Sequence, residues 1–371
     1  MLKKTISLIL ACILLSTAKC STNRAQTLKE AFKKDFLIGC AVGSAQMEGQ
    51  DPQGLAIVEE QYNTITLENG LKPGPVHPRP DSFSFDQADL FVEYGKKNNM
   101  FLIGHTLVWH AQTAPWMYRD SEGNLVDRET LLTRMKDHIF AVVGRYKGDI
   151  GGWDVVNEAL QDDGSDRRTR YRQIIGDDYV QKAFEFAREA DPGAELYYND
   201  FNLWKPEKRE GCIRLIRDLQ AKGVKIDGIG MQGHWGLDYP PIEEAEESFV
   251  AFSELGVQVM ITELDINILP DPGSWRGADL SLNVDAQKAV NPYVDGLPDS
   301  MQQVLADRYA EFFALFKKHS DKISRITFWG VHDGHSWLNY WPVRGRSNYP
   351  LLFGRDYLPK KAYYAVLETA R

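Results

Sequence analysis

Eight short apolar runs, each followed by a longer segment of helical character, recur along residues 27–371. This alternation is typical of βα units, in which a helix follows every strand. The runs that we expect to form strands span residues 36–42, 63–67, 100–107, 152–157, 195–199, 228–232, 257–263 and 323–330. Eight consecutive units predict an α/β fold, a closed (β/α)8 TIM barrel in a single domain.

Apolar residues between these runs recur at intervals of three or four, as one face of a helix requires. The clearest sets are Leu132, Met135, Ile139, Val142 and Tyr146; Val180, Ala183, Phe184 and Ala187; and Ile242, Ala245, Phe249 and Phe252. Asp191-Pro192-Gly193 follows the second set with residues that end a helix. An open, doubly wound sheet is the structural alternative, but no glycine-rich phosphate-binding turn follows the first strand. The barrel is therefore preferred.

The first residues have the pattern of an export signal. Lys3 and Lys4 precede an apolar run at 6–15, and Ser16-Thr17-Ala18 supplies a small-x-small cleavage pattern. The run is too short to remain as a membrane-spanning helix. We therefore predict a signal peptide at residues 1–18 and a folded domain at 27–371. The mature protein is expected to be secreted, periplasmic or held at the cell envelope.

The cysteines bear on both processing and stability. Cys20 lies close to where a bacterial lipoprotein would carry its lipidated cysteine, but Lys19 is a poor match because a small residue normally precedes that site. Soluble export is therefore preferred over a membrane lipid anchor. Outside the signal region only Cys40 and Cys212 remain, too few for a disulfide framework. The fold must be stabilised by its core, for which 43% hydrophobic residues are ample.

The overall charge limits the class of partner. The formal net charge is −9 and the sequence pI is near 5.5. Such an acidic surface disfavours nucleic acid or anionic lipid as the main partner. Nine tryptophans and sixteen tyrosines are compatible instead with a cleft that stacks on sugar rings.

Two of the expected strands end in a glutamate, Glu158 after the fourth and Glu263 after the seventh. The carboxyl ends of barrel strands share one rim, where active sites lie. Two carboxylates at one rim are the equipment of a glycosidase. The structural alternatives are an N-cap or surface role for Glu158 and a buried ion pair for Glu263.

Polar neighbours strengthen the catalytic interpretation. Asn157 offers an amide that could donate to a sugar hydroxyl. Asp265 lies two residues beyond Glu263, on the same face of an extended strand. His234, expected at the end of the sixth strand, could bridge Glu263 and Asp265 and keep the former ionised; alone, it would more often be a core histidine.

At this point the chain resembles a known family. Trp-Asp-Val-Val-Asn-Glu-Ala at 153–159 and Ile-Thr-Glu-Leu-Asp at 261–265 are similar to the two signatures of glycoside hydrolase family 10, the endo-β-1,4-xylanases. Further matching segments lie at 68–72, 104–110, 198–202, 230–234 and 328–333, with Ser336-Trp337-Leu338 just beyond. The resemblance implies a retaining double displacement on xylan, with Glu158 as acid/base and Glu263 as nucleophile. It implies neither a cofactor nor an obligatory protein partner.

The same resemblance implies a set of substrate ligands. Glu68, Asn69 and Lys72 would hold xylose units on the non-reducing side, although Lys72 would otherwise be read as an exposed lysine. The residues expected around the sugar being cleaved are His105, Trp109, Asn157, Gln232, His234, Trp329 and Trp337, with Asp265 behind them. A bulky wall at Trp337 would disfavour the hydroxymethyl group that distinguishes glucose from xylose.

Some features depart from the family pattern or from any simple one. Gly70-Leu71 and the segment 73–77 stand where many members are more acidic and helical, and 269–299, with Trp275, predicts a long loop after the seventh strand. His332 and His335 flank Asp333-Gly334, and His105 lies near His110, but neither spacing matches a strong metal-ligand pattern. We therefore predict no metal site.

Two alternative functions remain open. One is a related β-glycanase that acts on β-1,4-glucan or mixed-linkage chains. The other is a non-catalytic carbohydrate-binding protein on the same barrel, which the presence of both glutamates disfavours.

Overall fold

The computed structural model describes residues 27–270 and 290–371. The predicted signal peptide, Cys20 and Trp275 lie outside these residues. Within the described ranges, no helix combines the length and apolar character needed to cross a membrane.

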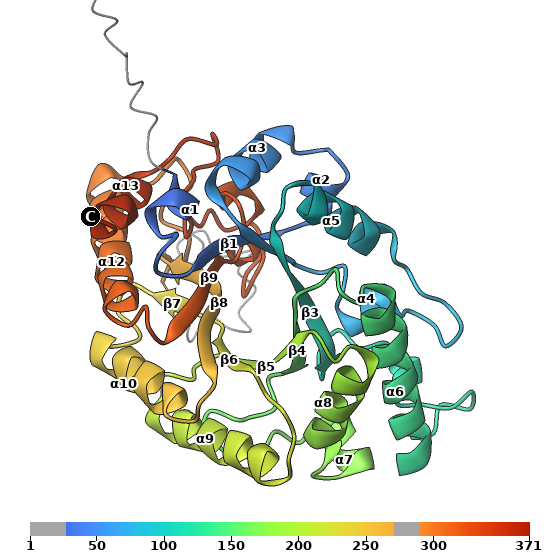
Figure 1. The fold of residues 1–371 in the computed structure, drawn as a ribbon. Helices are drawn as coiled ribbons and strands as arrows, with labels where there is room; N and C mark the ends of the chain where they lie inside the picture. Colours follow the sequence, from blue (N-terminus) through green and yellow to red (C-terminus); the bar gives the residue numbers. More distant parts are fainter. Residues whose placement is uncertain (1–26, 271–289) are drawn as a thin grey trace, which may run out of the picture.

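Eight parallel strands form a closed barrel surrounded by helices (Figure 1). Each strand pairs with its neighbours in chain order, and the pairing of β6 with β8 and of β9 with β1 closes the sheet. The predicted (β/α)8 barrel is therefore confirmed. Its strands are β1 (Leu37–Val42), β2 (Thr64–Leu67), β3 (Phe101–Trp109), β4 (Gly152–Asn157), β5 (Glu195–Asp200), β6 (Gly228–Met231), β8 (Gln258–Asn267) and β9 (Ile323–Phe328).

A ninth strand, β7 (His234–Gly236), was not expected from the sequence. The sixth barrel strand ends at Met231, so the prediction that His234 ends it is wrong. Gly233 adopts a left-handed φ of 82°, and a Cβ there would lie 2.7 Å from the Ile261 side chain. This turn lets His234 begin a separate strand that pairs with Asp265 on β8.

The extra pairing also lengthens β8. Residues 234–236 pair with 265–267, so β8 runs to Asn267 instead of ending at Glu263. Glu263 therefore lies inside a ten-residue strand with paired neighbours before and after it. A side chain on such a backbone has little freedom to move.

The long helices form the outer ring seen in Figure 1. They are α3 (Pro52–Gln61), α5 (Asp86–Lys97), α6 (Arg128–Arg145), α8 (Tyr179–Ala190), α9 (Pro206–Ala221), α10 (Ile242–Ser253), α12 (Asp299–Lys318) and α13 (Lys361–Thr369). Shorter turns are α1 (Leu28–Ala31), α2 (Ser44–Met47), α4 (Pro73–Val76), α7 (Arg170–Ile175), η1 (Pro115–Met117), η3 (Asp333–His335) and η4 (Trp337–Asn339). The segment that departs from the family pattern after Lys72 thus begins as the short helix α4.

The apolar faces predicted for the helices pack largely as expected. Met135, Ile139 and Val142 of α6 are buried, whereas Leu132 is only half-buried because Leu131 takes the inward position. Asp191 caps α8 where the Asp-Pro-Gly segment predicted its end.

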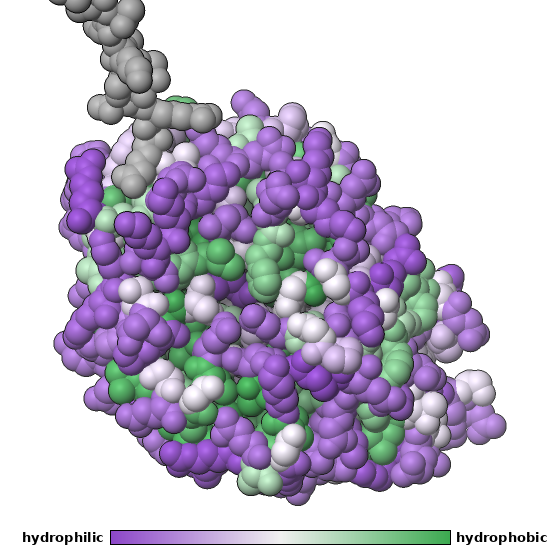
Figure 2. Space-filling view, in the orientation of Figure 1, coloured by the Kyte–Doolittle hydropathy of each residue, from purple (hydrophilic) through white to green (hydrophobic). Residues whose placement is uncertain are grey.

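The main core lies between strands and helices. A smaller cluster of Ile103, Tyr197 and Met260 comes from β3, β5 and β8, which are alternate barrel strands, as in a packed interior layer. Cys40 and Cys212 are buried free thiols. Hydrophilic residues dominate the face shown in Figure 2, and hydrophobic ones appear mainly in its recesses.

Candidate active site

Three side-chain amides connect the two candidate catalytic carboxylates. Gln232 donates from Nε2 to Oε1 of Glu158 at 3.0 Å and to Oδ1 of Asn157 at 3.2 Å. Asn199 donates from Nδ2 to the same Asn157 oxygen at 2.9 Å and to Oε1 of Glu263 at 2.7 Å. Glu158 and Glu263 therefore lie at one site, joined by a continuous chain of hydrogen bonds.

The barrel itself brings these groups together. Asn157 ends β4, Glu158 and Gln232 follow β4 and β6, and Asn199 and Glu263 lie within β5 and β8. Backbone hydrogen bonds join these segments at the rim. The Glu158 amide donates to Asn199 at 2.9 Å, and the Glu263 amide donates to Gln232 at 2.6 Å. Residues separated by about a hundred positions in the chain thus become neighbours because parallel strands share one carboxyl end.

A histidine clamps the buried carboxylate of Glu263. His234 places Nε2 3.1 Å from Glu263 Oε2 and Nδ1 3.1 Å from Asp265 Oδ1, so it bridges the two acids as the sequence predicted. Burial alone would lower the pKa of His234, but Asp265 and Glu263 raise it to about 10. The ring is therefore cationic at neutral pH and donates from both nitrogens.

The same surroundings keep Glu263 ionised. Burial alone would raise the pKa of this carboxyl, but the hydrogen bonds from His234 and Asn199 and the nearby imidazole of His105 bring it below its ordinary value near 4.5. Its side chain is only 6% exposed. A carboxylate that is ionised, shielded from water and fixed at both oxygens is suited to nucleophilic attack.

Glu158 has a different environment. Its side chain is 14% exposed, and its Oε1 accepts from Gln232 and, at 3.2 Å, from Asn157. Its Oε2 lies 4.0 Å from His110 Nε2. Burial lowers the pKa of His110, although the charge of Glu158 opposes this effect. Glu158 is thus the more accessible carboxylate, as proton exchange with water requires.

Lys72 is buried at the site, contrary to the default expectation of an exposed lysine. It is 6% exposed, and its Nζ donates to Asn69 at 2.9 Å. Burial lowers the pKa of Lys72, while the charges of Glu263, Glu68 and Glu158 oppose that shift. The ammonium group therefore lies within the field of all three acids.

Glu68 lies on the same side of the site. Burial raises the pKa of its carboxyl, and the charge of Lys72 opposes the change. Together with the exposed amide of Asn69, this group offers donors and acceptors for sugar hydroxyls.

Aromatic rings form the walls around these charges. The Nζ of Lys72 lies 5.2 Å from the Trp109 ring centroid and 6.0 Å from that of Trp329. The Trp329 ring meets His105 edge-on at 5.3 Å. The Trp337 ring lies 4.8 Å from the His234 ring. The structure thus brings every sequence-predicted ligand to this rim.

Two buried side chains at the site were not assigned roles from the sequence. Asn199 lies in the matching segment 198–202, and its position at the end of the fifth strand, beside the fourth, would have placed it at the rim. Asp154 Oδ2 lies 2.9 Å from His105 Nδ1, and both side chains are 2% exposed. It therefore fixes the orientation of the His105 ring.

A cleft of about 770 Å³ opens beside His234 and Asp265, the clamp on Glu263. His234, Asp265 and Trp337 line its inner wall, and Tyr239 and Trp341 line its outer part. Trp341 is 60% exposed, so an aromatic face is open to solvent next to the site. Such a combination of acidic and aromatic groups is suited to sugar rings.

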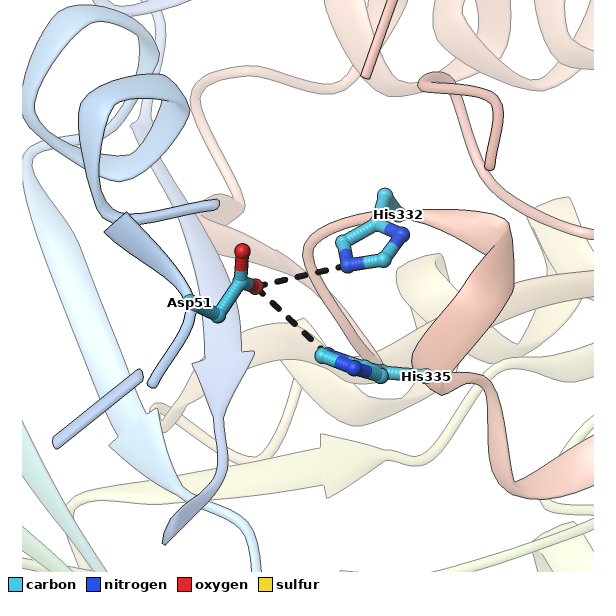
Figure 3. Close-up of side chains that lie close together, drawn as sticks. All are labelled: Asp51, His332 and His335. Atoms are coloured by element: carbon cyan, nitrogen blue, oxygen red, sulfur yellow. Dashed lines mark ion pairs between the residues drawn. The ribbon is translucent and has the colours of Figure 1, made fainter. Parts of the chain in front are cut away.

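A cluster of Asp51, His332 and His335 has the residue types of a metal site (Figure 3). Asp51 Oδ2 lies 3.4 Å from His332 Nε2 and 3.6 Å from His335 Nδ1. Asp51, not the Asp333 that the sequence places between the histidines, therefore faces both rings. Asp333 instead pairs with Lys360 at 2.8 Å.

Hydrogen-bond donors already point into this cluster. Gln46 donates from Nε2 to Asp51 at 2.6 Å, and the same nitrogen lies 2.9 Å from His335 Nδ1. The Gly334 amide donates to His332 Nδ1 at 3.2 Å, which leaves the proton of a neutral ring on Nε2, facing Asp51. The arrangement fits an internal hydrogen-bond network better than a metal site.

A family model and similar known proteins that we compared point to the same family. A family model described as Glycosyl hydrolase family 10 matches residues 27–369. The endo-1,4-beta-xylanase A of Xylanibacter ruminicola is 43% identical over 367 residues, covering 99% of each chain. An endo-1,4-beta-xylanase of Geobacillus stearothermophilus is 42% identical over 348 residues, covering 92% of this chain and 98% of that protein.

Solved structures agree with these sequences. A GH10 endoxylanase retrieved from a sugarcane soil metagenome matches with a TM-score of 0.88 and 41% identity, covering 93% of this chain and 100% of that one. A mutant structure in complex with xylotriose matches with a TM-score of 0.82 and 34% identity, covering 92% of this chain and 99% of that one.

Proposed function

Because the chain belongs to glycoside hydrolase family 10, a retaining family of endo-1,4-β-xylanases, we propose that Glu158 and Glu263 carry its reaction. The protein is an endo-1,4-β-xylanase that hydrolyses β-1,4-xylosidic bonds in xylan. Glu158 is the general acid/base and Glu263 the nucleophile. The observation that supports these roles best is the chain of amides that joins an accessible carboxylate to a buried, histidine-clamped one.

The reaction proceeds in two displacements. Glu263 attacks the anomeric carbon while Glu158 protonates the departing glycosidic oxygen, which leaves a covalent glycosyl-enzyme. Glu158 then removes a proton from water, which attacks the same carbon and releases Glu263. Retaining enzymes hold their two carboxyl groups about 5–5.5 Å apart for this purpose.

The hydrogen bonds around the pair suit this division of work. The cationic His234 and the Asn199 amide stabilise negative charge on Glu263 before attack. Gln232 and Asn157 donate to Glu158 and orient its carboxyl without enclosing it. Asn157, held by both other amides, is also available to a sugar hydroxyl at the cleaved residue.

The remaining ligands bind the xylan chain. Glu68, Asn69 and Lys72 hold hydroxyls on the non-reducing side, while His105, Trp109 and Gln232 contact the sugar being cleaved. Trp329 and Trp337 enclose that sugar, and the bulk of Trp337 excludes a hydroxymethyl group. The neighbour solved with xylotriose supports a xylo-oligosaccharide ligand.

Two comparisons test the function. The wild type should release reducing ends from xylan faster than from carboxymethylcellulose; the reverse preference would favour a β-glucanase. Glu263→Ala should retain xylan binding and lose turnover. An inactive wild type that still binds xylan would instead favour a carbohydrate-binding protein.

We also propose that the protein is exported and processed near residue 18. The lysines and the apolar run of the N-terminal segment support this proposal. N-terminal sequencing and intact-mass measurement of the protein from a bacterial host test it. A mature chain beginning after Ala18 without added mass supports soluble export, whereas a diacylglyceryl adduct on Cys20 would establish a lipid anchor.

A further inference from the structure

Glu158 has an unusual backbone conformation. Its φ is 59°, in the left-handed region that residues other than glycine rarely adopt. Such a conformation is unfavourable and persists only where the surrounding structure imposes it. The contacts of residues 158–160 therefore show what holds the carboxyl in place.

The three amide N–H groups of this tripeptide all donate to the next strand, β5. The Glu158 amide donates to the Asn199 carbonyl at 2.9 Å. The Ala159 amide donates to the Tyr198 hydroxyl at 3.1 Å, and the Leu160 amide donates to Asp200 Oδ2 at 3.3 Å. One side of the tripeptide is thus fixed to successive residues of one strand.

The three carbonyls of the tripeptide all accept from a single residue, Arg167. Its Nε donates to Glu158 at 3.0 Å, its Nη2 donates to Leu160 at 2.8 Å, and its backbone amide donates to Ala159 at 2.7 Å. A guanidinium is suited to this task because its donors form a rigid planar fork. No backbone polar group of residues 158–160 is left without a partner.

Asp200 is in turn held by a buried lysine. Lys208 of α9 places Nζ 2.9 Å from Asp200 Oδ1, and both side chains are fully buried. The Tyr198 hydroxyl also donates to Asp200 Oδ2, so the two side-chain acceptors on β5 are linked. The N–H side of the tripeptide is therefore as firmly anchored as the carbonyl side.

We propose that Arg167 is a positioning residue for the acid/base catalyst. It fixes the carbonyl side of residues 158–160 while the Asp200–Lys208 pair supports the N–H side, and together they hold Glu158 in its left-handed conformation. This inference rests on the proposed role of Glu158. Glu263 needs no such device because it lies within a paired strand, whereas Glu158 lies just beyond the end of β4. Misplacement of a catalytic group by about 1 Å can cost about a hundredfold in rate.

Leaving-group dependence distinguishes positioning from general stability. Cleavage of xylo-oligosaccharides needs proton donation to a poor leaving group, whereas a dinitrophenyl β-xylobioside does not. We would measure kcat/KM on both substrates, with the free energy of unfolding, for Arg167→Met and Arg167→Lys. Glu158→Gln provides the reference for loss of the acid.

Arg172→Met is the matched control. Arg172 pairs with Asp166, the residue before Arg167, and with Asp177 at 2.8 Å, and its side chain forms no hydrogen bond or ion pair with the described residues 158–160. Its removal loosens the same loop without touching the tripeptide. Both substrates should therefore respond alike, with little loss.

For Arg167→Met we expect kcat/KM on xylo-oligosaccharides to fall by about tenfold to a hundredfold, with the dinitrophenyl substrate changed less than about threefold. Arg167→Lys, which lacks the fork, should show the same selectivity with a smaller loss. Equal loss on both substrates in the folded variants, or loss on neither, would overturn the positioning role. If Glu158→Gln itself shows no selectivity, the acid/base assignment fails instead.

Discussion

The indole N–H of Trp337 donates to the carboxylate of Asp265 at 2.7 Å. Asp265 in turn contacts His234, which clamps Glu263. The side chain that we propose as the xylose-selecting wall is therefore hydrogen-bonded to the network that keeps Glu263 charged. Changes at Trp337 should affect selectivity and reactivity in separable ways.

Trp337→Ala removes both the bulk and the donor of this side chain. We expect the ratio of kcat/KM for aryl xylobioside to that for aryl cellobioside to fall by about tenfold or more, because space opens for a hydroxymethyl group. Trp337→Phe is the control that keeps most of the bulk and loses the N–H. It should lower both values alike, and an unchanged ratio in the alanine variant would contradict the role of Trp337 as a wall.

His234→Gln tests how Glu263, the proposed nucleophile, is kept ionised. The acid limb of the kcat/KM profile reports ionisation in the free enzyme, and a dinitrophenyl substrate removes the need for a proton donor. The native network lowers the pKa of Glu263 from its ordinary value near 4.5. Wild-type activity should therefore persist at pH values below 4.5. Loss of the cationic ring should move this limb to higher pH. A limb that does not move would show that His234 has no influence on Glu263.

The same histidine should make stability depend on alkaline pH. Its pKa is raised to about 10 from an ordinary value near 6.5. The stabilisation is therefore fully present below about pH 6.5 and is lost as pH rises through about 10. Urea unfolding across this pH window measures the free energy of unfolding of wild type and His234→Gln. The difference between the two should shrink as pH rises. A difference that stays the same across this window would contradict the proposed charge on His234.

Asp333→Ala should strongly destabilise the fold. Asp333 and Lys360 form a buried pair at 2.8 Å, and removal of the acid leaves an unpaired charge at a site where burial already lowers the pKa of Lys360. Breaking such a pair typically costs about 3–5 kcal/mol. Denaturant unfolding measures this loss.

An exposed ion pair supplies the comparison for that measurement. Asp321 contacts Lys322 at 2.7 Å with 71% of its side chain exposed, and exposed pairs of this kind contribute little to stability. Asp321→Ala should therefore change stability little. A similar small effect in Asp333→Ala would show that Lys360 finds another partner or water.

The barrel and its two rim glutamates could be predicted because each leaves a regular signal. Strands appear as apolar runs, helices as a three-to-four-residue spacing, and chain order fixes which strands are neighbours. Positions at strand ends then place Glu158, Gln232 and Glu263 together. The proposed bridge by His234 followed from the same reasoning, although the strand on which it lies did not.

Features that depend on a single backbone turn could not be predicted from the sequence. The left-handed turn at Gly233 creates a three-residue strand, too short to show a period, and so extends β8 beyond Glu263. The positive φ of Glu158 and its contacts with Arg167 involve mainly backbone groups, which every residue shares. The burial of Lys72 likewise arises from segments distant in the chain.

Because Glu158 and Glu263 are anchored differently, they should respond differently to heating. Glu263 is embedded in the sheet and can be displaced only when the barrel opens, whereas one of the two anchors of Glu158 is Arg167, which a loop supplies. Moderate heating should therefore release the proton donor before the sheet melts. An enzyme warmed towards its transition would then cleave activated glycosides at temperatures where its attack on the polymer has already faded.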